Sequence, residues 1–198
     1  MNFLAHIYLS GNHQELTTGN FIADFVKGSK MHDFSPGIIK GIELHRMIDR
    51  FTDGHPIVRE GKARLAVRYK KYSHVIIDIF YDHFLAAGWK LYSEEKLEDF
   101  AARFYAMMQK QQDILPERLQ QVMPYIIRQN WLVSYRRIEG IQQALNGMSR
   151  RATFESGMET ATEELVLHYD LFRNEFNAFF PELIAFSKTE TEKLFGDR

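Results

Sequence analysis

The stretch HVIIDIFYDHFLAAGW, residues 74–89, is apolar around almost all of its helical circumference. Such a helix has no polar face to turn to water, so we expect it at the centre of a domain, surrounded by other helices. The same helix carries Asp78, Asp82 and His83. A buried carboxylate without a partner is strongly destabilising. No Lys or Arg lies between positions 72 and 89, so the compensating charge must come from another helix or from a metal ion.

The rest of the chain also has the pattern of helices, and no segment shows the alternation and turn dipeptides of a hairpin. Ser35-Pro36 and Pro56 are typical helix starts, and Ser93 before two glutamates is a good N-cap. We expect one all-α, compact multi-helix domain over residues 1–198. The predicted helices cover roughly 20–27, 36–52, 56–71, 74–91, 94–113, 117–128, 130–147 and 155–180, with a short tail beyond Pro181.

Composition narrows the classes of function. The chain has a formal net charge of −1, which as a whole indicates no nucleic-acid or anionic-membrane partner. It has no cysteine, which excludes disulfides, thiolate metal ligands and cysteine nucleophiles. The start of the chain lacks the basic region of a signal peptide, and the longest apolar run contains too many Asp and His to span lipid. We therefore expect a soluble cytoplasmic protein.

A second helix, GIELHRMIDRFTD, places His45, Asp49 and Asp53 at intervals of four. Each step of four advances a helix by only about 40° beyond one full turn, so these side chains form one narrow stripe beside the apolar face. For Asp53 we favour a capping role at the next helix. A single His–Asp pair at this spacing is more often a surface pair or a satisfied hydrogen bond than a metal site.

Two more polar residues lie in apolar surroundings, His6 in NFLAHIYL and Asp24 in GNFIADFVKG. Each has a plain structural alternative: a hydrogen-bonded core histidine for His6, and the cap of a turn for Asp24. Three apolar segments that each hide such groups favour a shared divalent metal, with the oxygen-rich balance leaning to Mn²⁺ or Mg²⁺ and Fe²⁺ also possible. The candidate metal ligands are His6, Asp24, His45, Asp49, Asp78, Asp82 and His83.

These motifs, with MNFLAH at the start, DIFYDHFLA and the later WLVSYRRIEGIQQALNGMSRR, resemble the acyl carrier protein phosphodiesterases. The resemblance runs from residue 1 to about 180. It implies an enzyme that hydrolyses the 4′-phosphopantetheine arm from holo acyl carrier protein, the carrier of fatty acid biosynthesis, with a divalent metal that is typically Mn²⁺. It also implies a distant relation to the helical HD phosphohydrolases, hence an HD-phosphohydrolase-like fold. The HD signature is His followed by Asp, whereas this chain has Asp82 followed by His83.

Within the resemblance, Asp24, His45, Arg46 and Asp49 are the expected catalytic residues, with Arg46 reaching a phosphate oxygen. The carrier is a small acidic protein, so the resemblance also implies a basic landing surface. The stretch GKARLAVRYKKY between the two ligand-bearing helices is the candidate, although an ordinary solvated helix face would have the same sequence. Its basic residues are Lys62, Arg64, Arg68, Lys70 and Lys71.

Two other functions remain open from the sequence. The first is an HD-like metal phosphohydrolase that acts on a nucleotide or another small phosphoester, although no Gly-rich phosphate loop is present. The second is a helical binding protein without catalytic activity, in which Arg or Lys from other helices neutralise the buried acids.

Overall fold

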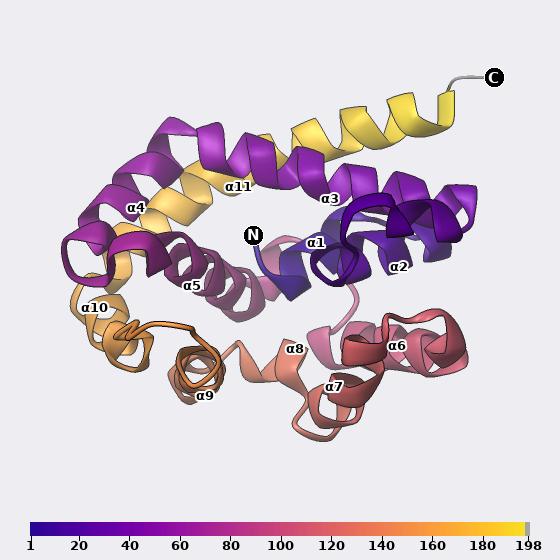
Figure 1. Ribbon diagram of the computed structural model, residues 1–198. Helices are drawn as coiled ribbons and strands as arrows, with labels where there is room; N and C mark the ends of the chain where they lie inside the picture. The colour runs from indigo at the N-terminus through magenta and orange to yellow at the C-terminus, as the bar shows by residue number, and fades with distance from the viewer. Residues whose placement is uncertain (197–198) are drawn as a thin grey trace.

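Two long helices, α3 (Pro36–Gly54) and α11 (Tyr169–Gly196), lie side by side along one edge of the molecule (Figure 1). Next to them, α4 (Pro56–Tyr69) leads into α5 (Ser73–Ala87), and the N-terminus lies in the middle of the view. This computed structural model describes residues 1–196, within which every regular element is helical. The remaining α-helices are α1 (Phe3–Leu9), α2 (Gln14–Ile22), α6 (Leu97–Lys110), α7 (Glu117–Arg128), α8 (Trp131–Ser134), α9 (Ile138–Ser149) and α10 (Ala161–Leu167).

Helix α5 is the centre of the core, as its sequence predicts. Its side chains Ile76, Phe80 and Leu85 are fully buried, and it packs against α1, α4, α9 and α11. Phe172 of α11 meets Phe80 edge-on, with ring centroids 5.2 Å apart. Full burial of each large apolar side chain contributes about 1.5–3 kcal/mol, so this helix and its neighbours hold much of the folding energy.

The all-α, single-domain prediction is confirmed over the described residues, and the last two residues of the predicted domain lie outside them. Several boundaries differ. The helix expected over 94–113 begins only at Leu97, and its N-cap is Lys96 rather than the predicted Ser93. The Ser93 hydroxyl instead accepts the backbone N–H of Glu95 at 3.2 Å. The helix expected over 130–147 is broken into α8 and α9. The break lets Gly140 press against the carbonyl of Ser134, where any Cβ would overlap it.

The tail expected beyond Pro181 is wrong, because α11 continues through this proline to Gly196. Proline removes one backbone N–H and crowds the preceding turn, so a helix interior tolerates it only with other support. That support is packing: Phe179, Phe180 and Leu183 around the proline are fully buried, and Phe186 stacks on Phe51 of α3 at 4.4 Å.

The N-terminal part of the chain is more helical than predicted. In place of one helix over 20–27, the chain forms α1, α2 and a 3₁₀ turn, Ala23–Phe25. Helices α2 and α3 cross with their backbones in contact at Gly19 and Gly41. A Cβ on either glycine would overlap the backbone of the other helix, so only glycine permits this distance. The crossing lies beside the segments that carry the candidate ligands.

Candidate metal centre

Three segments far apart in sequence bring the candidate ligands together. Helix α1 contributes His6, helix α3 contributes His45 and Asp49, and the 3₁₀ turn after α2 contributes Asp24. One ligand atom from each of His6, His45 and Asp49 lies within 4.8 Å of the other two. Both histidines are buried, whereas the Asp49 side chain is 41% exposed and Asp24 is 67% exposed, so the group opens to solvent on its carboxylate side.

The contacts within the group are short. Nε2 of His6 lies 3.2 Å from Asp49 Oδ1, and Nε2 of His45 lies 3.1 Å from Asp49 Oδ2. Asp24 Oδ1 lies 3.3 Å from the same His45 nitrogen. The two imidazole rings stack with centroids 3.9 Å apart. Two rings and two carboxylates therefore share one small volume at the meeting point of α1, α2 and α3.

Asn20 of α2 determines how both histidines present their nitrogens. Its Nδ2 donates to the carbonyl of His6 and to Ser10 Oγ, both at 2.9 Å, which turns Oδ1 toward Nδ1 of His6 at 2.7 Å. Its backbone carbonyl accepts from Nδ1 of His45 at 2.8 Å. An acceptor at Nδ1 fixes the proton there and leaves the Nε2 lone pair for a ligand. Asn20 thus aims both Nε2 atoms into the group.

The electrostatics of the group are strongly perturbed. Burial lowers the pKa of His45, but the carboxylates of Asp24 and Asp49 outweigh it and raise this pKa to about 9. Burial and the neighbouring His45 lower the pKa of His6 to about 4. Burial raises the pKa of Asp49, yet the hydrogen bond from His45 and the positive charge of the nearby Met1 ammonium bring it well below its usual value. The hydrogen bond with His45 also lowers the pKa of Asp24.

The donor set fits a divalent cation. In neutral His6 the lone pair of Nε2 faces two other hydrogen-bond acceptors, Asp49 Oδ1 and the Met1 carbonyl, each 3.2 Å away. Acceptors at this distance repel one another unless a cation lies between them. A proton on Nε2 of His45, whose pKa the carboxylates of Asp24 and Asp49 raise, supplies part of that positive charge. Two imidazoles with two carboxylates are a ligand mixture that suits Mn²⁺ or Fe²⁺.

The structure does not bring Asp78 and Asp82 of α5 into this group of ligand atoms. Asp78 lies 3.2 Å from the Met1 ammonium, which is itself 3.5 Å from Asp49. Asp82 accepts the backbone N–H groups of Leu4 and Ala5, at 2.8 and 3.2 Å, and so caps the first turn of α1. Burial raises the pKa of Asp78, and it raises that of Asp82 to about 7.

His83 and Arg46 also lie outside the group. Nδ1 of His83 is 2.8 Å from the Tyr135 carbonyl and Nε2 is 3.0 Å from the Tyr169 hydroxyl, so both ring nitrogens already have partners. Arg46 is exposed beside His45 on α3, where its guanidinium donates to the sulfur of Met31 at 3.4 Å. Among residues 1–196 no carboxylate pairs with Arg46.

The basic stretch on α4 is largely neutralised by acids from distant segments. Arg64 binds Glu175 of α11 with two hydrogen bonds, the shorter at 2.6 Å. Arg68 pairs with two glutamates of α10, and Lys62 pairs with Asp53. The cap expected from Asp53 is therefore wrong: Asp53 lies in the last turn of α3, and His55 is the N-cap of α4. Within residues 1–196, only Lys70 and Lys71 of this stretch have no carboxylate partner.

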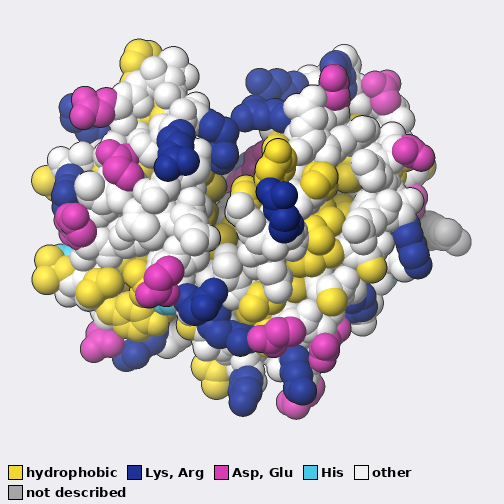
Figure 2. Space-filling view, turned by 90° about the horizontal axis from the view of Figure 1, so that it is seen from below, with side chains coloured by type: hydrophobic (Ala, Val, Ile, Leu, Met, Phe, Trp, Pro, Cys, Tyr) yellow, Lys and Arg dark blue, Asp and Glu magenta, His cyan; other side chains and the backbone are white. Residues whose placement is uncertain are grey.

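The lower face of the molecule is hollowed at its centre (Figure 2). Lys and Arg side chains lie on both sides of the hollow, and an acidic side chain is visible inside it. Across the described part of the chain, no helix is both long enough and apolar enough to cross a bilayer.

Comparison with known proteins decides the family. The sequence model described as acyl carrier protein phosphodiesterase matches residues 1–183. The chain belongs to the acyl carrier protein phosphodiesterase family. It is 34% identical over 189 residues to the acyl carrier protein phosphodiesterase of Escherichia coli O139:H28, which covers 93% of this chain and 96% of that relative. The protein of the same name from E. coli O9:H4 has the same identity and coverage. No solved structure matches the chain.

Membership in this family confirms two predictions, the family itself and a hydrolase of phosphodiester bonds. Sequence reasoning missed Asn20, although it lies in the motif GNFIADF, four residues before Asp24. A polar amide within an apolar helical segment was the available signal. The Met1 ammonium was also missed, because nothing in the pattern of α5 indicates that the start of the chain lies against it.

Proposed function

We propose that this protein is a metal-dependent phosphodiesterase that hydrolyses the 4′-phosphopantetheine arm from holo acyl carrier protein and releases the apo carrier. The observation that carries the proposal is the convergence of the His6 and His45 Nε2 atoms on the carboxylate of Asp49. Family membership supports the reaction, because the E. coli relatives are named for it. An HD-phosphohydrolase-like arrangement of helices is part of the same proposal.

We assign the cation, most simply Mn²⁺ with Mg²⁺ or Fe²⁺ as alternatives, to His6, His45 and Asp49, with Asp24 as the fourth candidate. When bound, such a cation lowers the pKa of a water molecule so that hydroxide forms near neutral pH, and it offsets charge on the phosphoryl oxygens. Asn20 keeps both imidazoles in the tautomer that a metal requires. Asp78, Asp82 and His83 support the fold around the site instead, through the contacts described above.

Asp24 and Arg46 have distinct roles in this mechanism. Asp24 is the most exposed member of the group and is ionised at neutral pH, so its carboxylate orients the attacking water and accepts its proton. Arg46 is exposed one residue after His45, and its guanidinium binds a non-bridging phosphate oxygen. The water that Asp24 deprotonates would add to phosphorus, the bond from phosphorus to the serine oxygen would break, and the serine oxygen would take up the proton that Asp24 had accepted.

The carrier is expected to meet basic side chains near the site, as the resemblance implies. Because Lys62, Arg64 and Arg68 are paired with acids, the field from α4 is weaker than the sequence predicts. Lys70 and Lys71 have no carboxylate partner within residues 1–196 and are the members of that stretch that we propose for docking. Attraction of this kind raises the association rate and weakens with salt.

The test is incubation of the protein with holo carrier and, separately, with a panel of nucleotides, in Mn²⁺ and in chelator. The proposal predicts release of phosphopantetheine and appearance of apo carrier in Mn²⁺ alone. Turnover of nucleotides without release of the arm would favour a different phosphohydrolase. A protein that binds no metal and turns over neither substrate would be a helical binding protein.

A further inference from the structure

A pocket at the turn between α6 and α7 lies outside the metal centre and has no role in the chemistry described above. It has a volume of about 290 Å³ and is lined by both helices and by the segment that joins them. None of its lining residues belongs to α1, α2, α3 or the 3₁₀ turn that carries Asp24. The two helices lie at the lower right of Figure 1, away from the N-terminus. The pocket is therefore a candidate site separate from the first.

The floor of this pocket is aliphatic. Met108 of α6, Leu115 of the joining segment and Met123 of α7 are buried there, with at most 5% of each residue exposed. Pro124 and Ile127 continue the apolar wall toward solvent. No aromatic ring is among the lining residues, so a planar ligand finds nothing to stack on. Methionine side chains are flexible and polarisable, and they adapt to a ligand that bends. This lining suits an unbranched alkyl chain better than a nucleobase.

The mouth of the pocket is polar and carries a single charge. Arg128, the last residue of α7, is exposed and is the one charged residue in the lining. Its guanidinium lies over the ring of Tyr125, 5.0 Å from the centroid, and within residues 1–196 no carboxylate pairs with it. The exposed amides of Gln109 and Gln112 add hydrogen-bond donors beside it. An apolar floor below a cationic mouth fits an alkyl chain that ends in an anion.

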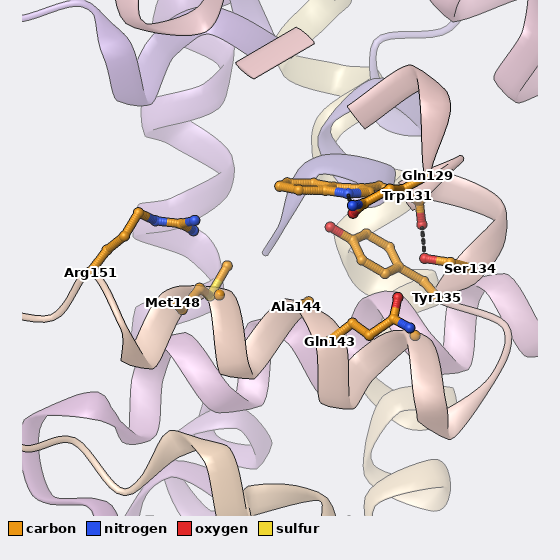
Figure 3. A pocket seen from close by; sticks show the side chains of 10 residues that line it. Gln129, Trp131, Ser134, Tyr135, Gln143, Ala144, Met148 and Arg151 are labelled. Atoms are coloured by element: carbon orange, nitrogen blue, oxygen red, sulfur yellow. Dashed lines mark hydrogen bonds between the residues drawn. The ribbon is translucent and has the colours of Figure 1, made fainter. Parts of the chain in front are cut away.

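A second pocket, between α8 and α9, lacks this combination. Trp131 and Tyr135 lie on one side of it and Arg151 on the other (Figure 3). Its volume is only about 40 Å³, which holds about one or two water molecules and no alkyl chain. The 290 Å³ between α6 and α7 is close to the lower limit of small-molecule sites, about 300 Å³. Size and lining together therefore favour the pocket between α6 and α7.

We propose that the pocket between α6 and α7 binds a single-chain alkyl anion, such as a medium-chain carboxylate. The alkyl chain lies on Met108, Leu115 and Met123, and the carboxylate accepts hydrogen bonds from Arg128. Burial of methylene groups supplies the affinity, and the guanidinium selects the charge of the head group. The ligand binds as a monomer, because the pocket has room for one chain. This proposal goes beyond the proposed function, since neither the metal centre nor the carrier takes part in it.

Isothermal titration of the full chain with decanoate, in chelator and below the micelle concentration, measures this binding without the metal centre. Decanoate should bind at one site, and octanoate, with two methylenes fewer, should bind about tenfold more weakly. Arg128→Gln should weaken decanoate binding about fivefold, the effect of an exposed ion pair. Arg118→Gln, on the same helix outside the pocket, should leave the affinity unchanged. Equal affinity of Arg128→Gln and the wild type would overturn the proposal.

NMR of the protein labelled with carbon-13 at its methionine methyl groups locates the ligand. Saturating decanoate should shift the signals of Met108 and Met123 and leave that of Met158, which is buried elsewhere, in place. Ile127→Trp narrows the pocket and should abolish both shifts, whereas Gln121→Trp, at an exposed position of α7, should preserve them.

Two results would overturn the proposal in this second experiment. They are a wild type that binds decanoate only above the micelle concentration, and shifts at Met158 in place of Met108 and Met123. Neither measurement uses holo carrier or a bound metal. A protein that releases no phosphopantetheine but binds decanoate in this pocket would therefore refute the proposed function and support the second site.

Discussion

Replacement of Asn20 by alanine tests the role of this buried amide in the site. The change removes the acceptor of the His6 Nδ1 proton and the donor to the His6 carbonyl, while the backbone carbonyl that binds His45 remains. The carbonyl of His6 keeps its second donor, the Ser10 hydroxyl at 2.8 Å. The Nδ1–H group of His6 thus loses its only partner, which costs about 1–3 kcal/mol of folding free energy. The proton of His6 is then no longer held on Nδ1, and the other tautomer becomes accessible.

We expect Asn20→Ala to lower the free energy of unfolding by about 3 kcal/mol and to weaken metal affinity roughly 10- to 100-fold. Urea unfolding and isothermal titration with Mn²⁺ measure the two effects separately. Thr18→Val is the matched control, because Thr18 lies on the same helix, is fully buried and has its hydroxyl within hydrogen-bond distance of the Gln14 carbonyl and the Gln111 side chain rather than of a histidine. Thr18→Val should lower the free energy of unfolding by about 1 kcal/mol and bind Mn²⁺ with the affinity of the wild type. Equal affinity in Asn20→Ala and wild type would refute the reasoning.

Three further predictions concern the support, the pH dependence and the docking surface of the site. Gly41→Ala places a Cβ against the Leu16 carbonyl, so it should destabilise the fold by about 3 kcal/mol and weaken Mn²⁺ binding, and an unchanged affinity would contradict this. Burial raises the pKa of Asp82 to about 7, so its contribution to stability is complete below pH 4 and is lost as the pH rises through 7. Relative to Asp82→Asn, the free energy of unfolding of the wild type should therefore fall by up to about 4 kcal/mol between pH 4 and 7, as measured by chemical unfolding. The same pH dependence of stability in both proteins would exclude this. Lys71→Glu should raise KM for holo carrier about threefold at low salt and not at high salt, whereas Lys110→Glu on α6 should not, and a salt-independent effect would argue against steering.

The sequence could predict the parts of the fold and site that depend on local pattern. The central position of α5 follows from its unbroken apolar surface, and the proximity of His45 and Asp49 follows from a spacing of four in a helix that continues past both. His6 is one polar residue in an apolar segment, which predicts burial but not which partner it meets. These predictions needed only helical geometry and the energetic penalty for burying charge.

Tertiary contacts decided what the sequence could not predict. The aspartates of α5 indicate a need for positive charge, and in the structure Asp78 contacts the Met1 ammonium while Asp82 accepts two backbone N–H groups of the first turn of α1. The basic residues of α4 indicate a charged surface, but Glu175 and the glutamates of α10 neutralise it from more than 90 positions away. The path of α11 through Pro181 depends on aromatic packing with α3, which no local pattern indicates.

Crystals of the protein soaked in Mn²⁺, with diffraction data collected at the manganese absorption edge, test the central claim most directly. The account predicts one strong anomalous peak in contact with Nε2 of His6, Nε2 of His45 and the carboxylate of Asp49. It also predicts that Nδ1 of His6 and Nδ1 of His45 keep their hydrogen bonds to the side chain and the backbone carbonyl of Asn20. A fully soaked crystal without a peak at that position, with His45 still bonded to both carboxylates, would contradict the account.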